Sequence, residues 1–339
     1  MLDLTDPDFV GSILIASFGI PLVSILYATV LPGIERKIQA RIQQRIGPGV
    51  LTPGFFNIFK FIFKHKPVIT STLPTLYKWS PFVGVISLYL VLVFTTPQWA
   101  DILGLGSLVA IIGLLKVEEF MYVVMGYLSS NILSVRLPYP DTARGSKWPD
   151  AYRSTLENWG SVRMWKMIML ASLPLYMALF IPVAATRSIK IWEIVNAQSG
   201  GNAFVFTVPG FVGTVVFFFG YVAILNEYPF SIGKAKADLL EGPMMELASS
   251  WRASYYLMRA LVMFAVSSVF VTLYFGVPLD PLNGLNLLIH FLLVLIMPVA
   301  TAILSAFSPI LTFRQLIPLS IVITLVGFFT FVMTMGGAL

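Results

Sequence analysis

Long apolar stretches with few charges are the feature that most restricts the fold of this chain. A transmembrane helix needs about 20 predominantly apolar residues to cross a bilayer. Within lipid, only helices and closed barrels satisfy all their backbone hydrogen bonds, and continuous apolar runs of this length do not suit barrel strands. We therefore predict an all-α polytopic membrane protein, in which residues 1–339 form a single membrane domain. The eight predicted transmembrane helices cover approximately residues 11–31, 80–97, 102–125, 161–185, 204–226, 253–276, 285–307 and 315–335.

The composition supports this class and excludes several kinds of site. Hydrophobic residues make up 57% of the chain and charged residues 11%, with a mean hydropathy of +0.85, whereas soluble domains are about 45–50% apolar and about 25% charged. The chain has no cysteine and only two histidines, His65 and His290. Without cysteine, the chain cannot form disulfides, thiolate metal sites or iron–sulfur ligands. We therefore expect no cofactor and no metal in this chain, and any iron–sulfur clusters would belong to partner subunits.

The distribution of basic residues predicts the orientation. The loops after the first, third, fifth and seventh predicted spans carry 18 of the 22 Lys and Arg residues, if the residues that open the next helix are included. The positive-inside rule places these loops in the cytoplasm and both termini outside. We expect a multi-pass protein of the cytoplasmic (inner) membrane, embedded in the lipid bilayer.

The first long loop contains a candidate interfacial helix. In FFNIFKFIFKHK (55–66), apolar residues recur at helical spacing, with Lys60 and Lys64 set apart from them. This pattern predicts one amphipathic helix that lies in the membrane interface.

The start of the same loop concentrates charge. In IERKIQARIQQRIGPG (34–49), Lys37, Arg41 and Arg45 lie four residues apart and would share one face of a helix. We expect Gly47-Pro48-Gly49 to end that helix. The loop would either anchor the chain to anionic headgroups or dock a soluble partner, and composition leaves both interpretations open.

The loop also resembles that of a known family. Its Glu-Arg-Lys run, its spaced Arg and Gln residues and its Arg-x-Gly-Pro end are similar to the first cytoplasmic loop of the H-type membrane subunit of the respiratory complex I superfamily, the subunit next to the quinone site. Two later stretches, GYLSSN (126–131) and PFSIGKAKADLLEGPMMEL (229–247), also resemble that subunit. The resemblance covers almost the whole chain and implies eight spans with outer termini. The predicted docking-loop residues are those that the resemblance indicates, together with the basic residue Arg41 on the same helix face. They are Glu35, Arg36, Lys37, Arg41, Gln43, Arg45, Gly47 and Pro48.

Several positions depart from the quinone-reducing members of that family. The later loop carries lysines where those members have acids, and an unpaired charge in a buried site is costly. The resemblance therefore supports the family's scaffold, and the departures weaken the case for its quinone role. It is closest in character to the equivalent subunit of archaeal membrane-bound hydrogenase and sulfur-reducing complexes, which use ferredoxin and no quinone. The changed positions are Ser231, Lys234, Lys236, Leu247 and Ala171.

Charges inside the predicted spans are candidates for an ion path or for coupling, because a charge at mid-bilayer costs about 2.5–3.5 kcal/mol on insertion scales. Lys116 and Glu119 lie three residues apart and can pair, whereas Glu118 points elsewhere and is the better candidate for an interior proton site. The alternative is a hydrated cluster near the cytoplasmic end of the helix. Arg259 needs an acidic partner, and both a structural ion pair and a functional relay are open. Acids in the loops are equally consistent with plain interfacial carboxylates. The candidate set is Lys116, Glu118, Glu119, Glu227, Asp238, Glu241, Glu246 and Arg259.

Together with the resemblance, these features predict a non-catalytic membrane anchor and coupling subunit of a multi-subunit redox-driven H⁺ or Na⁺ pump. The resemblance implies hydrogenase-like large and small subunits and antiporter-like membrane subunits as partners. Two alternatives stay open: a quinone-site subunit of a divergent NADH or ferredoxin:quinone oxidoreductase, and a stand-alone secondary transporter, against which the lack of an internal repeat argues. GPGVLTPG lacks phosphate-loop spacing, so a nucleotide site is not expected. No nucleic acid is expected as a partner.

Overall fold

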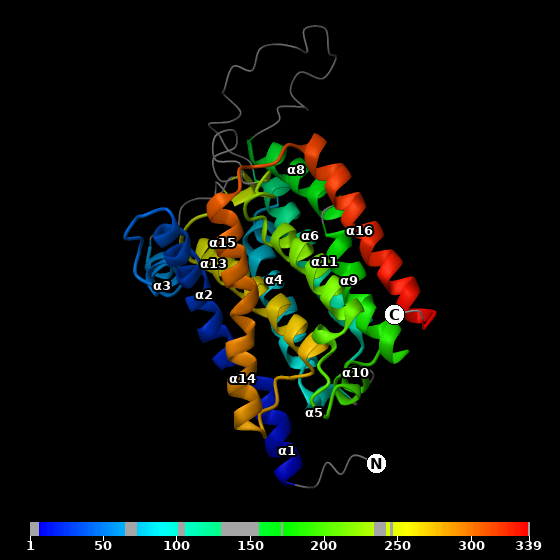
Figure 1. Cartoon of the computed structure of the whole chain (residues 1–339). Coiled ribbons are helices and arrows are strands. Elements are labelled where there is room, and N and C mark those ends of the chain that lie inside the picture. Colours follow the sequence, from blue (N-terminus) through cyan, green and yellow to red (C-terminus); the bar gives the residue numbers. More distant parts are fainter. Residues whose placement is uncertain are drawn as a thin grey trace.

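The computed structural model describes residues 7–64, 73–100, 106–129, 156–170, 172–233, 242–244 and 247–337. These residues form a bundle of long helices (Figure 1). Their one β-type pairing is an isolated bridge between Ser107 and Lys190. The predicted all-α class is therefore confirmed for the part of the chain that the structure describes.

The helix bounds follow the apolar stretches closely. Short π-helical turns join α1 to α2 (Ile15–Gly19), precede α3 (Thr52–Phe56) and extend α13 (Val271–Phe275). Short 3-10 turns cover Phe204–Phe206 and Gly242–Met244. The α-helices are α1 (Pro7–Leu14), α2 (Ile20–Ile42), α3 (Asn57–Ile62), α4 (Pro74–Phe94), α5 (Pro97–Ala100), α6 (Leu108–Leu128), α8 (Leu156–Leu170), α9 (Leu173–Thr186), α10 (Ile191–Ala197), α11 (Val208–Leu225), α13 (Ser249–Phe270), α14 (Gly284–Val294), α15 (Ile296–Phe307) and α16 (Phe313–Met335).

Seven helical segments among the described residues are long and apolar enough to cross a membrane. They are Gly11–Ile42, Pro74–Phe94, Trp159–Thr186, Val208–Leu225, Ser249–Phe275, Gly284–Phe307 and Phe313–Met335. Each overlaps one predicted span. The remaining predicted span, 102–125, falls on α6, which has 21 residues but carries the charged sequence Lys-Val-Glu-Glu in its interior. The membrane-helix class is confirmed, while the count of eight crossings stays a prediction.

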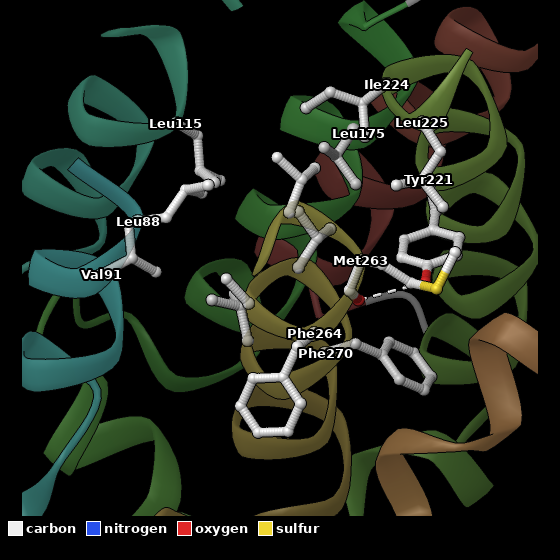
Figure 2. Packing of buried hydrophobic residues seen from close by; sticks show 14 of the residues in the cluster. Leu88, Val91, Leu115, Leu175, Tyr221, Ile224, Leu225, Met263, Phe264 and Phe270 are labelled. Carbon is white, nitrogen blue, oxygen red and sulfur yellow. Dashed lines mark hydrogen bonds between the residues drawn. The ribbon is translucent and has the colours of Figure 1, made fainter. Parts of the chain in front are cut away.

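The central helix of the bundle is α13, which packs against α2, α3, α4 and α11. Interior side chains of neighbouring helices meet its apolar residues in a closely packed core, and such packing is what holds helices together in lipid. α9 also packs on α11, and α16 covers both of them. Figure 2 shows this interior with Leu88 and Val91 from α4, Leu115 from α6, Leu175 from α9, Tyr221, Ile224 and Leu225 from α11, and Met263, Phe264 and Phe270 from α13.

The two ends of the bundle carry different elements (Figure 1). α1, α5 and α10 lie at the lower end of the view, whereas α8 and the α15–α16 connection lie at the upper end. From that connection α16 runs downward, toward the side of the bundle on which α1 begins.

The predicted amphipathic helix is present as α3, which is shorter than expected. It ends at Ile62 and follows the π-helical turn, while residues 65 and 66 lie outside the described residues. Ile58 faces the protein, whereas Phe56, Phe59 and Phe63 are exposed. The amphipathic pattern is therefore real, and its location in a membrane interface stays a prediction.

A buried charged cluster as the candidate functional site

α6 carries two carboxylates into the interior of the bundle. Glu118 and Glu119 are only 2% and 4% exposed. A methyl group built on Gly84 would lie 3.7 Å from Cγ of Glu118, and Gly84 is the middle residue of α4 (Pro74–Phe94). Because α4 is long enough to cross a membrane, Glu118 lies at mid-helix depth. Both carboxylates are therefore shielded from solvent within the bundle, while their depth in a membrane stays a prediction.

Glu119 pairs with Lys116 on the same helix. The Nζ atom of Lys116 lies 2.6 Å from Oε2 of Glu119, and it also donates to Oγ of Ser172 at 3.0 Å. The hydroxyl of Tyr176 donates to the other carboxylate oxygen at 3.1 Å, and the Lys116 ammonium lies 4.2 Å from the centre of the Tyr176 ring. Both oxygens of Glu119 therefore accept charge-assisted or hydroxyl hydrogen bonds, which is how a carboxylate is stabilised away from water. The pair expected from the i,i+3 spacing is present.

Glu118 turns to a different helix and meets Arg259 of α13. Oε1 of Glu118 lies 3.6 Å from Nη1 of Arg259, which is an ion pair beyond hydrogen-bond distance. The guanidinium also donates to the carbonyl oxygens of Ile224, at 3.4 Å, and of Leu225. These are the last carbonyls of α11, where a cation is favoured by the helix dipole.

Arg259 therefore links three helices. Its guanidinium carbon lies 5.5 Å from the centre of the Tyr122 ring, a cation–π distance. Glu227 is close enough to act electrostatically on the same guanidinium. Of the acids considered as partners for Arg259, Glu118 is in salt-bridge distance, and Glu246 lies outside the described residues.

Both carboxylates and Arg259 line one cavity of about 10 Å³. A cavity of this size has room for about one water molecule. Its polar lining includes Glu118, Glu119, Tyr122, Ser172 and Arg259, which offers the several hydrogen-bonding partners that a buried water needs.

The predicted docking loop differs from expectation in where its helix ends. α2 ends at Ile42, before Gly47-Pro48-Gly49, and Gln44 adopts a left-handed φ of 56°. The backbone N–H of Arg45 then donates to the carbonyl of Ala40 at 2.7 Å. This back-folded hydrogen bond closes the helix. The prediction that Arg45 continues the Lys37–Arg41 face was therefore wrong, because the chain reverses before it reaches Arg45.

The Gly residues of the loop have a steric role. Gly47 has a φ of 70°, and a methyl group there would lie 2.6 Å from Cβ of Ala40. Further on, a methyl group at Gly54 would lie 1.8 Å from the carbonyl oxygen of Thr29. The loop backbone therefore lies directly against α2, and glycine is needed at both contacts.

The position of Glu35 is the second difference from the predicted docking loop. It is 5% exposed and accepts a hydrogen bond from Gln39 at 3.0 Å, so it belongs to the interior rather than to the loop surface. The signal was in the sequence, because Glu35 continues the buried helical stripe of Ala28 and Leu31. The other docking-loop residues are exposed or half-buried: Arg36, Lys37, Arg41, Gln43, Arg45, Gly47 and Pro48.

The positions changed relative to quinone-type members are only partly described. Ser231 and Leu247 are buried, at 6% and 1% exposure. The other changed or candidate residues in these regions lie outside the described residues: Ala171, Lys234, Lys236, Asp238, Glu241 and Glu246.

Two contacts of the charged cluster were not predicted. Ser172 and Tyr176 reach Lys116 and Glu119 from the start of α9. They lie four residues apart in an otherwise apolar segment, which places both on one helix face. This spacing of polar groups within a predicted span could have indicated from the sequence that both side chains face the interior.

The contacts of His290 are those of a structural residue. Nδ1 of His290 lies 2.7 Å from the carbonyl oxygen of Val277, and Nε2 lies 2.9 Å from Oγ of Ser268. In the described ranges, no group of three or more His, Cys, Asp or Glu side chains is arranged to hold a metal ion.

Comparison with known proteins identifies the family. A family model described as NADH dehydrogenase matches residues 15–135 and 151–335. An uncharacterized protein of Methanocaldococcus jannaschii is 40% identical, over 96% of this chain and 98% of its own length. The H-type subunit of the NADH-quinone oxidoreductase of Chlorobaculum tepidum is 27% identical, over 82% of this chain and 75% of its own length.

A solved structure has the same fold. A chain of the membrane-bound sulfane sulfur reductase, an archaeal respiratory membrane complex, matches with a TM-score of 0.79 and 20% identity, over 95% of this chain and 99% of that chain. The fold is therefore shared across nearly the whole length of both chains. Together with the family match, it confirms the resemblance found in the loops. The chain belongs to the NADH dehydrogenase family and is a membrane subunit of the complex I superfamily, similar to the H-type subunits.

Proposed function

We propose that this chain is the membrane anchor and coupling subunit of a multi-subunit, redox-driven H⁺ or Na⁺ pump. Its basic loops would hold a cytoplasmic, hydrogenase-like electron-transfer module, and its buried carboxylates would respond to charge changes in that module. The observation that carries the proposal is the presence of two ion pairs, Glu118 with Arg259 and Glu119 with Lys116, whose buried carboxylates line one cavity.

Electrostatics supports a coupling role for this cluster. Intramembrane charges are costly, and they mark ion or proton paths more often than structural sites. The four charged groups of the two pairs sum to zero. Adding a proton to either carboxylate leaves its basic partner uncompensated, so protonation and the local charge balance are linked. A change in charge near Arg259 would therefore shift the proton occupancy of Glu118.

The inner position of Glu35 supports a connection to the docking loop. Glu35 directly precedes the exposed Arg36 on α2, yet its own carboxylate is buried. A partner bound at the basic surface would therefore lie next to a helix that carries a buried carboxylate.

The arrangement of the ends supports the predicted topology. α6 lies beside α4 along its length, and counting it as a crossing gives eight. An even number of crossings agrees with α16 running toward the side of the bundle on which α1 begins (Figure 1). In this proposal, residues 1–339 form one membrane domain of the cytoplasmic membrane with both termini outside. The partners would be hydrogenase-like large and small subunits, which hold the iron–sulfur clusters, and antiporter-like membrane subunits.

Purification of the native complex tests the proposal. A tag on this chain should recover soluble redox subunits and further membrane subunits together, and the reconstituted complex should take up H⁺ or Na⁺ when a low-potential donor such as reduced ferredoxin is supplied. A chain that purifies alone and transports a solute by itself would contradict the proposal and favour a secondary transporter.

A quinone-site role is the second candidate, and the observation that favours it is the similarity to a Chlorobaculum tepidum protein that belongs to an NADH-quinone oxidoreductase. It predicts quinone in the purified complex and electron transfer that quinone-site inhibitors block. Two buried residues count against this role. By the resemblance, quinone-type members carry Asp at the position of Ser231 and Tyr at the position of Leu247. A complex that lacks quinone and is insensitive to such inhibitors would exclude it.

A further inference from the structure

We propose that the junction between α3 and the start of α13 binds the headgroup phosphate of an anionic phospholipid. Lys60 and Lys64 of α3 would hold the phosphate, with Arg252 of α13 beside them. The site requires only that the chain lies in a membrane, so it stands or falls independently of the proposed coupling function.

Three positive charges gather around one aromatic ring at this junction. The Lys64 ammonium lies 5.0 Å from the centre of the Phe61 ring, and the Lys60 ammonium lies 6.0 Å from it. The guanidinium carbon of Arg252 lies 5.5 Å from the same centre. Charges of one sign repel one another at such separations, and more strongly where water is partly excluded. A bound anion would offset this repulsion.

Tertiary contacts hold the end of α3 against α13, which packs beside it (Figure 1). Ile58 anchors α3 in the interior, at 9% exposure. The hydroxyl of Ser249 donates to the carbonyl oxygen of Lys64 at 2.7 Å, and the rings of Phe61 and Tyr256 have their centres 5.5 Å apart. The bases from the two helices therefore meet because the fold brings their backbones together.

The two lysines face outward, whereas the arginine is held in place. Lys60 and Lys64 are exposed, and among the residues that the structure describes no carboxylate lies within salt-bridge distance of either. Arg252 is half-buried and donates to the Tyr256 hydroxyl at 3.2 and 3.3 Å. Each ammonium has three N–H donors, and phosphate oxygens accept such charge-assisted hydrogen bonds well.

The apolar surroundings indicate that the anion is part of a lipid. Phe56, Phe59 and Phe63 lie in the same segment as the lysines and are 55%, 45% and 82% exposed. The adjoining segment Ser249–Phe275 is long and apolar enough to cross a membrane, so Arg252 lies near the end of a transmembrane helix. A free anion would leave the three aromatic side chains uncovered. A phospholipid matches both features, because its acyl chains cover apolar side chains while its phosphate meets the bases.

The experiment measures lipid binding by the full chain, in the complex purified from its native membranes, with two matched double variants. Lys60→Gln with Lys64→Gln removes two exposed charges from the site, and Arg187→Gln with Lys190→Gln removes two exposed charges beside α10. The probe is labelled phosphatidylglycerol added to the delipidated complex, with phosphatidylcholine as the lipid without net charge. We expect the first variant to weaken phosphatidylglycerol binding about thirtyfold, because each base contributes about a fivefold factor at an anionic surface. The second variant should bind like the wild type.

Competition and cross-linking distinguish a lipid from other anionic ligands. Inorganic phosphate should not displace phosphatidylglycerol at equal concentration, and a photo-crosslinking residue at Phe63 should form an adduct with phospholipid. Displacement by inorganic phosphate would mean a site for the free anion, and an adduct with a soluble subunit alone would mean a protein contact. Either result would overturn the inference, as would equal binding by the two double variants or equal affinity for the two lipids.

Discussion

Glu118 and Glu119 are neighbours on α6, yet they pair with bases from different sources: Glu119 lies 2.6 Å from the Lys116 ammonium on its own helix, and Glu118 lies 3.6 Å from the Arg259 guanidinium of α13. Adjacent residues on a helix point about 100° apart, so one carboxylate is held locally and the other across the bundle. Both carboxylates line one small cavity together with Arg259. We therefore expect the local pair to be largely structural and the cross-helix pair to be the more responsive one.

Glu118→Gln should separate ion transport from electron transfer. The amide keeps the size of the side chain but cannot hold a negative charge or release a proton, so Arg259 remains beside a neutral group. We expect assembly and electron transfer to persist while ion uptake per electron is lost in reconstituted vesicles.

The matched control is Glu193→Gln, which changes an exposed side chain of α10. The Ser188 hydroxyl and the neighbouring Lys190 hold the pKa of the Glu193 carboxyl below its usual value, so this group is also ionised at neutral pH. It should be dispensable for transport. Normal ion uptake by an assembled Glu118→Gln complex would exclude a relay role for Glu118.

Arg259→Met should destabilise the chain by about 3–5 kcal/mol, because it leaves the buried Glu118 carboxylate without its base. It also removes the donors to the last carbonyls of α11. Arg259→Lys should cost less, since it keeps a cation at the helix end. Denaturation in detergent, monitored by the loss of folded chain, measures the difference, and equal stability of the two variants would contradict an ion-pair role.

Tyr176→Phe should cost about 1.5–3 kcal/mol, the range for a hydrogen bond to a charged group. The ring that lies under Lys116 is retained, so the change isolates the hydroxyl contact with Glu119. Tyr274→Phe is the control, because its hydroxyl donates to the neutral carbonyl of Ala178 at 2.8 Å and should cost about 0.5–1.5 kcal/mol. The same unfolding measurement applies, and a larger loss for Tyr274→Phe would mean that Glu119 is uncharged.

Gly54→Ala should displace the first loop from α2. The added methyl group would lie 1.8 Å from the Thr29 carbonyl oxygen, whereas at Gly49 it would meet only the Thr52 hydroxyl, at 3.1 Å. We expect faster amide hydrogen exchange across residues 43–56 in Gly54→Ala than in Gly49→Ala. We also expect the soluble module to dissociate from the former. Identical exchange in the two variants would show that this contact does not fix the loop.

Arg41→Glu distinguishes docking from lipid anchoring. Arg41 is exposed at the end of α2, and reversing its charge should weaken the soluble module's attachment, more so at low ionic strength. Lys190→Glu, an exposed base before α10, is the control at the other end of the bundle. Retention of the soluble subunits during washing with increasing salt is the measurement. If module retention is unchanged while membrane association falls, the loop is an anchor.

The sequence by itself determined the class of fold and the local features of the site. Long apolar stretches require helices in lipid, and seven such segments appear where they were predicted. The Lys116–Glu119 pair also follows from sequence, because three-residue spacing on a helix brings two side chains together regardless of tertiary structure. The family resemblance rested on residues of the first loop, and the comparisons confirm it.

The tertiary structure alone decided the rest. Among the described acids, the one at salt-bridge distance from Arg259 depends on how α6 and α13 pack, and no local pattern specifies that. The inward position of Glu35 and the early end of α2 depend on the loop folding back against Ala40 and Thr29. Helical periodicity acts within one segment, whereas contacts between segments are fixed only when the whole bundle is packed.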